Sequence, residues 1–281
     1  MSVICNVCFR HCTLQDGEYG FCHARRAEND TVVGSTYGKV TALALDPIEK
    51  KPLNRFYPGS KILSVGLYGC NLRCPFCQNH EIAMADRTAE RKLGIRQCSP
   101  EDLLHLAQSC VPDGNIGLAF TYNEPMISVE YVRDTEQLIK NAGMKTALVT
   151  NGCATEQALQ EVLPLTDAMN IDLKCFREDL YASVLGGNLP MVKDFIARSH
   201  EQCHVELTTL LVPGLNDTEE DLMNEVEWIA GLPNGADIPL HLTRFFPRFH
   251  YADRKPTPVS TVYALAEKAR TCLNYVYVGN C

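Results

Sequence analysis

From residue 61 onward, strand-like and helix-like stretches alternate along the chain. Repeated strand–helix units predict a parallel sheet with helices outside it. Six complete units are too few for the eight of a closed triose-phosphate-isomerase barrel, which leaves a partial, open barrel or a doubly wound sheet. In both folds, functional side chains lie at the carboxyl ends of the strands. The predicted strands are Lys61–Gly66, Asn115–Tyr122, Met144–Thr150, Asp167–Leu173, His204–Leu211 and Ile238–Phe245, with Tyr275–Val278 as a candidate seventh.

Helix-start signals support this alternation of strands and helices. Ser99 is followed by Pro100 and two acids, which is typical of a capped helix start, and Thr218 begins a similar signature. A helix after the second strand is expected to run to about Asn141, and Gly143 fits its C-terminal stop. Further helices are expected around 155–163, 178–200, 218–230 and 260–271.

The first 60 residues read differently from the rest. We expect a Cys-rich metal-binding segment over 1–30, then a strand and connecting loop over 31–60, then the barrel over 61–281. The strand is expected at Thr31–Leu45 and the polar loop at Asp46–Pro52.

Cysteine is unusually frequent, with 14 residues. The N-terminus lacks the apolar core of a signal peptide, and no stretch approaches the roughly 18 apolar residues of a membrane helix. We therefore expect a cytoplasmic protein with reduced thiols and no membrane partner, whose clustered cysteines serve metal binding or catalysis. Seven dispersed cysteines are expected to be mostly plain core.

Charge narrows the range of partners. Lys and Arg total 26 against 34 Asp and Glu, a net charge of −8, which argues against a nucleic-acid partner. One short strip, Thr243–Lys255, mixes basic and aromatic residues and could grip a phosphate-bearing substrate. Its shortness and the acidic total favour a lid with a packed aromatic base and a solvated charged rim.

The loop after the first barrel strand carries Cys70, Cys74 and Cys77 at C-x3-C-x2-C spacing. Thiolates at this spacing suit one iron–sulfur cluster, and only three local ligands would leave one iron open to a substrate. The alternative is a structural zinc site with His80 as a fourth ligand, since such sites normally close with four protein ligands.

A second group consists of Cys5, Cys8, Cys12 and Cys22. Four cysteines this close can hold a tetrahedral zinc ion or a second iron–sulfur cluster, and His11 and His23 offer substitute ligands. A segment of about 30 residues buries too little apolar surface to fold alone, so a bound metal makes physical sense. Zinc and a cluster both remain open.

The stretch G-C-N-L-R-C-P-F-C at 69–77 resembles the signature of radical S-adenosylmethionine (SAM) enzymes, including Phe76 before the third cysteine. The wider pattern is similar to the branch of pyruvate formate-lyase activating enzymes, and most similar to the AmmeMemoRadiSam system radical SAM family. The supporting motifs are C-x2-C-x3-C-x9-C at 5–22, D-P-I-E-K-K-P-L at 46–53, C-P-F-C-Q-N at 74–79, F-T-Y-N-E-P at 120–125, T-N-G at 150–152, N-I-D-L-K at 170–174, P-G-L-N-D at 213–217 and Y-V-Y-V-G-N at 275–280.

The resemblance implies an open (β/α)6 radical SAM barrel. Cys70, Cys74 and Cys77 would bind a [4Fe–4S] cluster whose fourth iron chelates SAM. The implied SAM contacts are Phe76 near the adenine, Tyr122, Asn123 and Glu124 at the methionine amino group, Asn151, the Asp172–Lys174 pair, and His241 on the ribose side. In the family, Glu124's motif carries two glycines, which larger residues replace here.

The resemblance also implies an activity and partners. A reduced flavodoxin or ferredoxin would donate one electron, and a 5′-deoxyadenosyl radical would abstract hydrogen from a substrate, for which a protein segment suits an open barrel. One alternative is an enzyme that installs a glycyl radical on a partner. The alternative of another class is a non-catalytic zinc-binding interaction module.

Each implied SAM contact also has a purely structural interpretation. Asp172 and Lys174 share a strand face and could form only an ion pair at the rim. Glu124 precedes Pro125 and could be a helix N-terminal acid, and His241 could be a hydrogen-bonded core residue. Their combination with the cysteine loop favours the functional interpretation.

Overall fold

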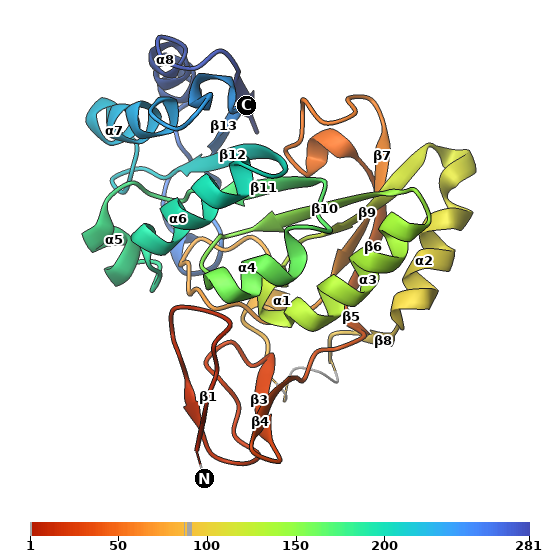
Figure 1. Ribbon diagram of the computed structural model, residues 1–281. Helices are drawn as coiled ribbons and strands as arrows, with labels where there is room; N and C mark the ends of the chain where they lie inside the picture. The colour runs from red at the N-terminus through yellow and green to blue at the C-terminus, as the bar shows by residue number, and fades with distance from the viewer. Residues whose placement is uncertain (1, 87, 89–91) are drawn as a thin grey trace.

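The architecture is that of a computed structural model, which describes residues 2–86, 88 and 92–281. Its main sheet has eight strands in the order β14-β13-β12-β11-β10-β9-β7-β6 (Figure 1). Its members are β6 (Ala42–Pro47), β7 (Lys61–Gly66), β9 (Asn115–Phe120), β10 (Lys145–Thr150), β11 (Ala168–Asp172), β12 (His204–Leu211), β13 (Leu240–Arg244) and β14 (Val276–Gly279).

The strand order shows which of the two expected architectures is present. From β7 to β14 each strand pairs in parallel with the next along the sheet, and only β6 is antiparallel. A doubly wound sheet reverses its strand order at a switch point, and this sheet does not. In the described part of the chain, β14 and β6 form the two edges and do not pair. The expected open, partial barrel is therefore confirmed, and its seventh parallel strand is present.

The local signals explain where the helices begin. In α2 (Pro100–Ser109), Ser99 accepts a hydrogen bond from the main-chain N–H of Asp102, whose carboxylate accepts one from Ser99 N in return. In α7 (Glu219–Ala230), Thr218 accepts from Asp221 N. Such caps satisfy main-chain donors that have no partner within a helix, so both predicted starts are confirmed. The remaining α-helices in the described part of the chain are α1 (His80–Ala83), α3 (Val129–Asn141), α4 (Glu156–Val162), α5 (Glu178–Ser183), α6 (Leu189–His200) and α8 (Val259–Ala269).

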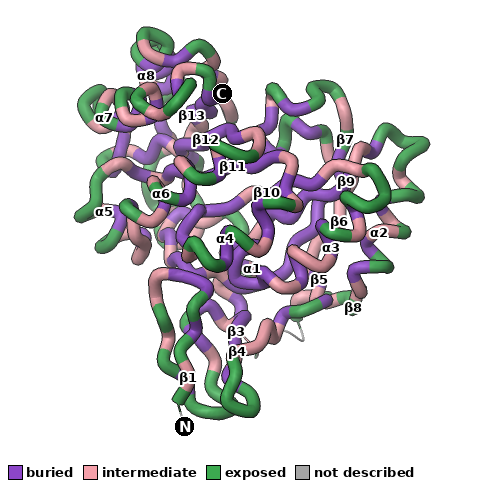
Figure 2. Tube along the Cα trace, viewed as in Figure 1, coloured by how far each residue is buried: buried purple, intermediate pink, exposed green. Residues whose placement is uncertain are grey.

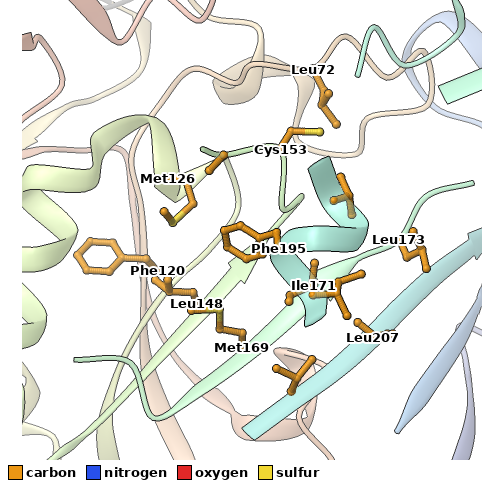
Figure 3. Packing of buried hydrophobic residues seen from close by; sticks show 14 of the residues in the cluster. Leu72, Phe120, Met126, Leu148, Cys153, Met169, Ile171, Leu173, Phe195 and Leu207 are labelled. Atoms are coloured by element: carbon orange, nitrogen blue, oxygen red, sulfur yellow. The ribbon is translucent and has the colours of Figure 1, made fainter. Parts of the chain in front are cut away.

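The apolar face of each helix packs on the sheet. Buried side chains form one large cluster between the strands and α6, in which Phe195 of α6 lies against Ile171 and neighbouring strand residues (Figure 3). Figure 2 shows the same pattern, with buried residues along the strands and exposed ones on the outer helix faces. Among the described residues, no helix has the length and apolarity needed to cross a membrane.

Two expected elements are wrong. Thr31–Leu45 is not one strand: β4 (Thr31–Gly34) forms a hairpin with β3 (Arg25–Glu28), β5 (Lys39–Val40) pairs with β8 (Arg96–Gln97), and β6 joins the main sheet. The left-handed backbone of Gly38, with φ of 74°, breaks the strand. The expected polar loop also begins late, because β6 runs to Pro47 and a 3-10 turn, η1 (Ile48–Lys50), follows.

The expected helix over 178–200 is two helices. Gly186 and Gly187 lie between α5 and α6, and Asn188 starts α6 by accepting a hydrogen bond from Met191 N. The cap turns a single periodic stretch into a helix–turn–helix.

The N-terminal segment consists of two small hairpins, β1 (Val3–Ile4) with β2 (Thr13–Leu14), and β3 with β4. They lie at one end of the sheet, below α1 and α4 in Figure 1. The hairpin of β3 and β4 crosses residue 30, and the division into 1–30, 31–60 and 61–281 stays a prediction.

Candidate functional site

A cavity of about 640 Å³ lies at the carboxyl ends of the parallel strands. Its lining includes the loop cysteines and every SAM contact that the sequence implies: Cys70, Cys74, Cys77, Phe76, Tyr122, Asn123, Glu124, Asn151, Asp172, Lys174 and His241. Glu49 and Lys50 of η1 and residues 277–280 at the end of β14 line it as well, so the cavity reaches both edges of the open sheet. The fold thus gathers side chains from distant parts of the sequence around one space.

The three loop cysteines are largely shielded from solvent. Cys74 is buried, and Cys70 and Cys77 are half-buried. Burial raises the pKa of Cys74 to about 12 and also raises that of Cys77, while the nearby Lys174 ammonium opposes both shifts. Among the described residues, no three His, Cys, Asp or Glu side chains converge as the ligands of one metal ion would. Cysteines of a cluster bind different irons, so thiols spread around one cavity suit that chemistry.

His80 does not line this cavity. Its ring stacks on Phe249 with centroids 4.6 Å apart, and its Nδ1 lies 3.3 Å from the carbonyl oxygen of Cys77. These contacts describe a packed imidazole rather than a fourth ligand facing the three thiols.

Glu124 is a buried carboxyl group with three hydrogen-bond donors around it. Only 2% of it is exposed, and burial raises its pKa to about 7. It accepts hydrogen bonds from Met126 N (2.9 Å), Thr150 Oγ1 (2.7 Å) and Asn151 N (2.8 Å). It caps the short helix η4 (Pro125–Ser128), as the structural interpretation expects. It also spans to the end of β10, and within the described residues it forms no ion pair.

The side chains of Asn123 and Tyr122 form hydrogen bonds that hold the turn around Glu124. Asn123 Oδ1 accepts a hydrogen bond from Leu67 N (3.0 Å), and its Nδ2 donates to Gly69 O (3.2 Å). Tyr122 has a left-handed backbone with φ of 73°, and its hydroxyl donates to Asp46 Oδ2 (2.8 Å). The Asn123 side chain therefore ties the Glu124 turn to the start of the cysteine loop.

Asp172 and Lys174 form the ion pair that the structural interpretation expects, with Nζ 2.8 Å from Oδ2. Burial favours the neutral amine, but the charges of Asp172 and of the thiols at Cys74 and Cys77 hold the pKa of Lys174 above its usual value. The lysine is therefore a cation directly beside the loop cysteines.

His241 lines the cavity and is anchored by a residue that sequence reasoning missed. Its Nε2 lies 2.7 Å from Glu206 Oε2, and its ring stacks on Tyr277 at 5.2 Å. Glu206 also bonds His204 Nε2 (2.9 Å) and accepts from the main-chain N–H groups of Asn54 and Arg55 (3.0 and 2.7 Å).

Glu206 is fully buried and ionised. Burial alone would raise its pKa, but the hydrogen bonds from both histidines and from Arg55 N lower it to about 2. The sequence signal for this site was Glu206 itself, a charged residue in the middle of a predicted buried strand. Buried charges need partners, so its position predicts a polar network around it.

Asn151 and Asn71 connect the strand ends to the cysteine loop. Asn151 Nδ2 donates to Asn71 Oδ1 (2.9 Å) and lies 3.7 Å from Cys70 Sγ. Asn71 Nδ2 in turn donates to Cys153 O (2.8 Å). Asn71 is the second residue that sequence reasoning missed, although it lies within the C-x3-C-x2-C motif.

The N-terminal cysteines form a separate group outside the cavity. Cys5, Cys8 and Cys22 are buried and Cys12 is half-buried. Burial raises the pKa of Cys8 and raises that of Cys22 to about 12, and the neighbouring thiols add to both shifts. The four thiols are therefore close enough to interact electrostatically, but no three of them converge as the ligands of one metal ion would. Their role as metal ligands stays a prediction.

The strip Thr243–Lys255 packs over the cysteine loop. Tyr251 lies 6.1 Å from Phe76 between ring centroids, and Phe245 is fully buried. Arg248, Arg254 and Lys255 are exposed. The aromatic base is thus packed at Phe245 and Tyr251 but not at Phe246, which is exposed, and the role of the strip as a lid stays a prediction.

Comparison with known proteins adds an independent observation. The family model of the Radical SAM superfamily matches residues 65–228. An uncharacterized protein of Methanocaldococcus jannaschii is 36% identical over 286 residues, which cover 99% of this chain and 81% of that protein. The pyruvate formate-lyase-activating enzyme of Listeria monocytogenes is 25% identical over 234 residues, covering 78% of this chain and 92% of the enzyme.

Solved structures show the same fold. A domain of the pyruvate-formate lyase-activating enzyme of Bacteroides vulgatus matches with a TM-score of 0.50 and 18% identity, over 58% of this chain and 99% of that one. SuiB of Streptococcus suis matches with a TM-score of 0.59 and 14% identity, over 77% of this chain and 48% of SuiB. SuiB has also been solved bound to S-adenosylmethionine and to the precursor peptide SuiA. This chain spans about half the length of SuiB.

Proposed function

The chain belongs to the radical SAM superfamily, and on that premise we propose that its cavity binds a [4Fe–4S] cluster and SAM for hydrogen abstraction from a substrate. Membership implies both groups. It also favours an enzyme over a non-catalytic zinc-binding module. Within the superfamily, we propose that the chain belongs to the AmmeMemoRadiSam group, because its motifs resemble those of that group.

One observation carries the proposal: three cysteines and all the side chains implied as SAM contacts line one cavity. They come from the ends of β9, β10 and β11, from within β13 and from the cysteine loop. The linear sequence separates them by up to 171 positions, from Cys70 to His241. Convergence at the carboxyl ends of parallel strands is the placement expected of a functional site.

The residues fit the two groups chemically. Soft thiolates are the usual ligands of iron–sulfur clusters, and no fourth cysteine lines the cavity, which agrees with an iron left open for SAM. Glu124 presents a buried carboxylate that has hydrogen bonds but no cation of its own. An amino group is the complement such a carboxylate needs, because an uncompensated buried charge is costly.

When bound, the two groups supply the superfamily's chemistry: one electron cleaves SAM to methionine and a 5′-deoxyadenosyl radical, which takes a hydrogen atom from the substrate. The chain's own residues bind and orient these two groups. Cys70, Cys74 and Cys77 hold the cluster, Glu124 holds the amino group, and Lys174 offsets negative charge beside Cys74 and Cys77. Phe76 and Tyr251 shield this end of the cavity from water.

The partners we propose are a flavodoxin or ferredoxin as the electron donor and a protein segment as the substrate. The unpaired edges of the sheet support the second proposal, because the cavity lining reaches both β14 and η1. A segment of chain could reach the cavity between them.

The test is 5′-deoxyadenosine formation by anaerobically reconstituted protein given SAM and dithionite. We expect product from the wild type and from Cys110→Ala, a half-buried cysteine at the end of α2, and none from Cys74→Ala. Iron-loaded wild-type protein that cleaves no SAM under these conditions would overturn the proposal.

A glycyl-radical activating role is the second candidate, favoured by the similarity to the Listeria activating enzyme. It predicts that a glycyl-radical protein incubated with this enzyme, SAM and reductant gains the doublet electron paramagnetic resonance signal of a glycyl radical. Absence of the signal across the glycyl-radical proteins of the same cell would exclude this role.

We also propose Cys5, Cys8, Cys12 and Cys22 as a second metal site, for zinc or an iron–sulfur cluster. Metal analysis of a chain with Cys70, Cys74 and Cys77 all replaced by alanine distinguishes the two. Retained zinc or retained iron identifies the occupant, and a metal-free chain would contradict the site.

A further inference from the structure

The cysteine loop is held from outside by the N-terminal segment. Gly69 lies directly against the main chain of Cys22: a side chain there would begin 2.4 Å from the Cys22 carbonyl oxygen. Cys8 forms an isolated β-bridge with Ala154, and Thr155 N donates to Val7 O (2.9 Å). The segment is therefore docked on the loop that follows β10 as well as on the cysteine loop.

Arg10 is the side chain that makes this docking specific. Its Nε donates to Asn71 O (2.8 Å) and its Nη2 donates to Gly186 O (2.7 Å). These two carbonyls lie in the cysteine loop and in the turn between α5 and α6. A guanidinium offers several donors in one rigid plane, so it can hold two carbonyl groups at a set separation.

An aromatic ring supports the guanidinium. Arg10 lies 3.4 Å from the ring centroid of Phe21, and Arg73 lies 4.0 Å from it. Arg73 comes from the cysteine loop itself and donates to Cys70 O, Leu72 O and Phe21 O at 2.7, 2.8 and 2.7 Å. Stacked guanidinium groups are positioned by such rings, so the two arginines brace the loop together.

The contact continues to the proposed SAM site. Asn71, whose carbonyl Arg10 holds, also accepts from Asn151 Nδ2, and Asn151 N donates to Glu124. Leu72 and Cys153, which Figure 3 labels, belong to the same large buried cluster. A displacement of Asn71 would therefore shift both the thiols of the cysteine loop and the carboxylate of Glu124.

We propose that Arg10 is a positioning residue: from the N-terminal segment, it fixes the main chain of the loop that carries Cys70, Cys74 and Cys77. The importance of that loop rests on the proposed function, but the contact itself does not. Arg10 acts through Asn71 and touches none of the groups proposed to react.

The experiment is hydrogen–deuterium exchange of the full-length, reduced chain, read out for the main-chain amides of residues 69–78. Hydrogen bonds to charged donors contribute about 1.5–3 kcal/mol, so Arg10→Gln should accelerate exchange in the loop by about tenfold or more. Arg26→Gln is the matched control, because Arg26 lies on the same segment and pairs only with exposed Glu28 among the ion pairs described. We expect it to leave the loop unchanged.

Arg10→Lys separates geometry from charge. A lysine keeps the positive charge but has one nitrogen, which cannot hold both carbonyls in a fixed plane. We expect Arg10→Lys to accelerate exchange almost as much as Arg10→Gln. Wild-type exchange in Arg10→Lys would show that charge alone suffices and would overturn the proposal, as would wild-type exchange in Arg10→Gln.

A general loss of structure has a different signature. If Arg10→Gln disrupts the whole fold, exchange would rise in β10 to β12 as well as in the loop. In that case Phe21→Leu replaces Arg10→Gln as the test variant, because it removes only the supporting ring. Faster exchange confined to the loop in Phe21→Leu would support the proposal. Unchanged loop exchange in Phe21→Leu would contradict it. The measurement needs neither cluster nor SAM, so failure of SAM cleavage in the wild type would count against the proposed function alone.

Discussion

The main-chain N–H of Asn151 lies 2.8 Å from Glu124 Oε2, which joins the end of β10 to the carboxylate at the end of β9. Three donors surround this carboxylate, but none is a cation. Burial raises the pKa of Glu124 to about 7, although these hydrogen bonds and the Lys174 ammonium lower it. The site is therefore suited to a further, bound positive group beside this carboxylate.

Glu124→Gln should weaken SAM binding while leaving iron loading unchanged. The glutamine keeps the shape and loses the charge, and a charge-assisted hydrogen bond of about 1.5–3 kcal/mol corresponds to roughly 10- to 150-fold in affinity. Equilibrium dialysis of the iron-loaded protein measures this. Glu156→Gln, an exposed acid that begins α4, is the control. Equal SAM affinity in both variants would contradict the role of Glu124.

Stability of the metal-free chain should fall as pH rises from about 5 to 8. Burial raises the pKa of Glu225 to about 8, so the folded state holds a proton that the unfolded chain has already lost in this range. Each such group then lowers the free energy of unfolding by up to about 1.4 kcal/mol per pH unit. Glu136, with a pKa also raised to about 8, acts in the same direction.

The local geometry agrees with a protonated Glu225. The Thr209 hydroxyl contacts both Leu173 O and Glu225 Oε1, and its single proton can serve only one of them. Glu225→Gln should therefore flatten part of the pH dependence seen in urea unfolding. An unchanged slope in the variant would show that Glu225 is ionised when folded.

Glu206→Gln should destabilise the fold by about 2–4 kcal/mol, because a buried network loses its central anion. Two histidine rings and two main-chain N–H groups meet this carboxylate, and a single amide oxygen cannot accept from all of them. Urea unfolding at pH 7 measures the change. The neighbouring surface substitution Glu201→Gln should stay within about 0.5 kcal/mol of the wild type. Similar losses in the two variants would rule out a special role for the network.

Lys174→Met should slow alkylation of Cys77 in the metal-free chain. The ammonium of Lys174 lowers the pKa of that thiol against the effect of burial, so its removal leaves less of the reactive thiolate at pH 8. Timed iodoacetamide labelling with peptide mass spectrometry gives the rate for each cysteine. Cys110 at the end of α2 provides the internal reference. A faster reaction at Cys77 would mean that Lys174 acts mainly by covering the thiol.

The predictable parts of this fold are those written in short stretches of sequence. The limits of β7 and β12 follow from their apolar runs, and the starts of α2 and α7 follow from Ser99 and Thr218. The lining residues could be assigned to one cavity because parallel strands bring their carboxyl ends together.

Other features depend on contacts that no local pattern contains. The break of Thr31–Leu45 into separate strands reflects different partners for each piece, including β8, which lies far along the chain. The network around Glu206 needs His241 from the next strand and the loop at Asn54. The docking of the N-terminal segment through Arg10 has no sequence signal beyond one arginine among many.

The large sequence separation between Arg10 and Gly186 determines when their hydrogen bond can form during synthesis. Its partner Gly186 lies 176 residues later in the chain. At about 5–20 residues per second, a ribosome needs on the order of 10 to 35 seconds to add that length. Until then the hydrogen bond from Arg10 to Gly186 cannot form, although the cysteine loop and the loop after β10 have already been synthesised. The N-terminal segment can therefore contact the cysteine loop first, and Arg10 fixes it against the turn between α5 and α6 only later.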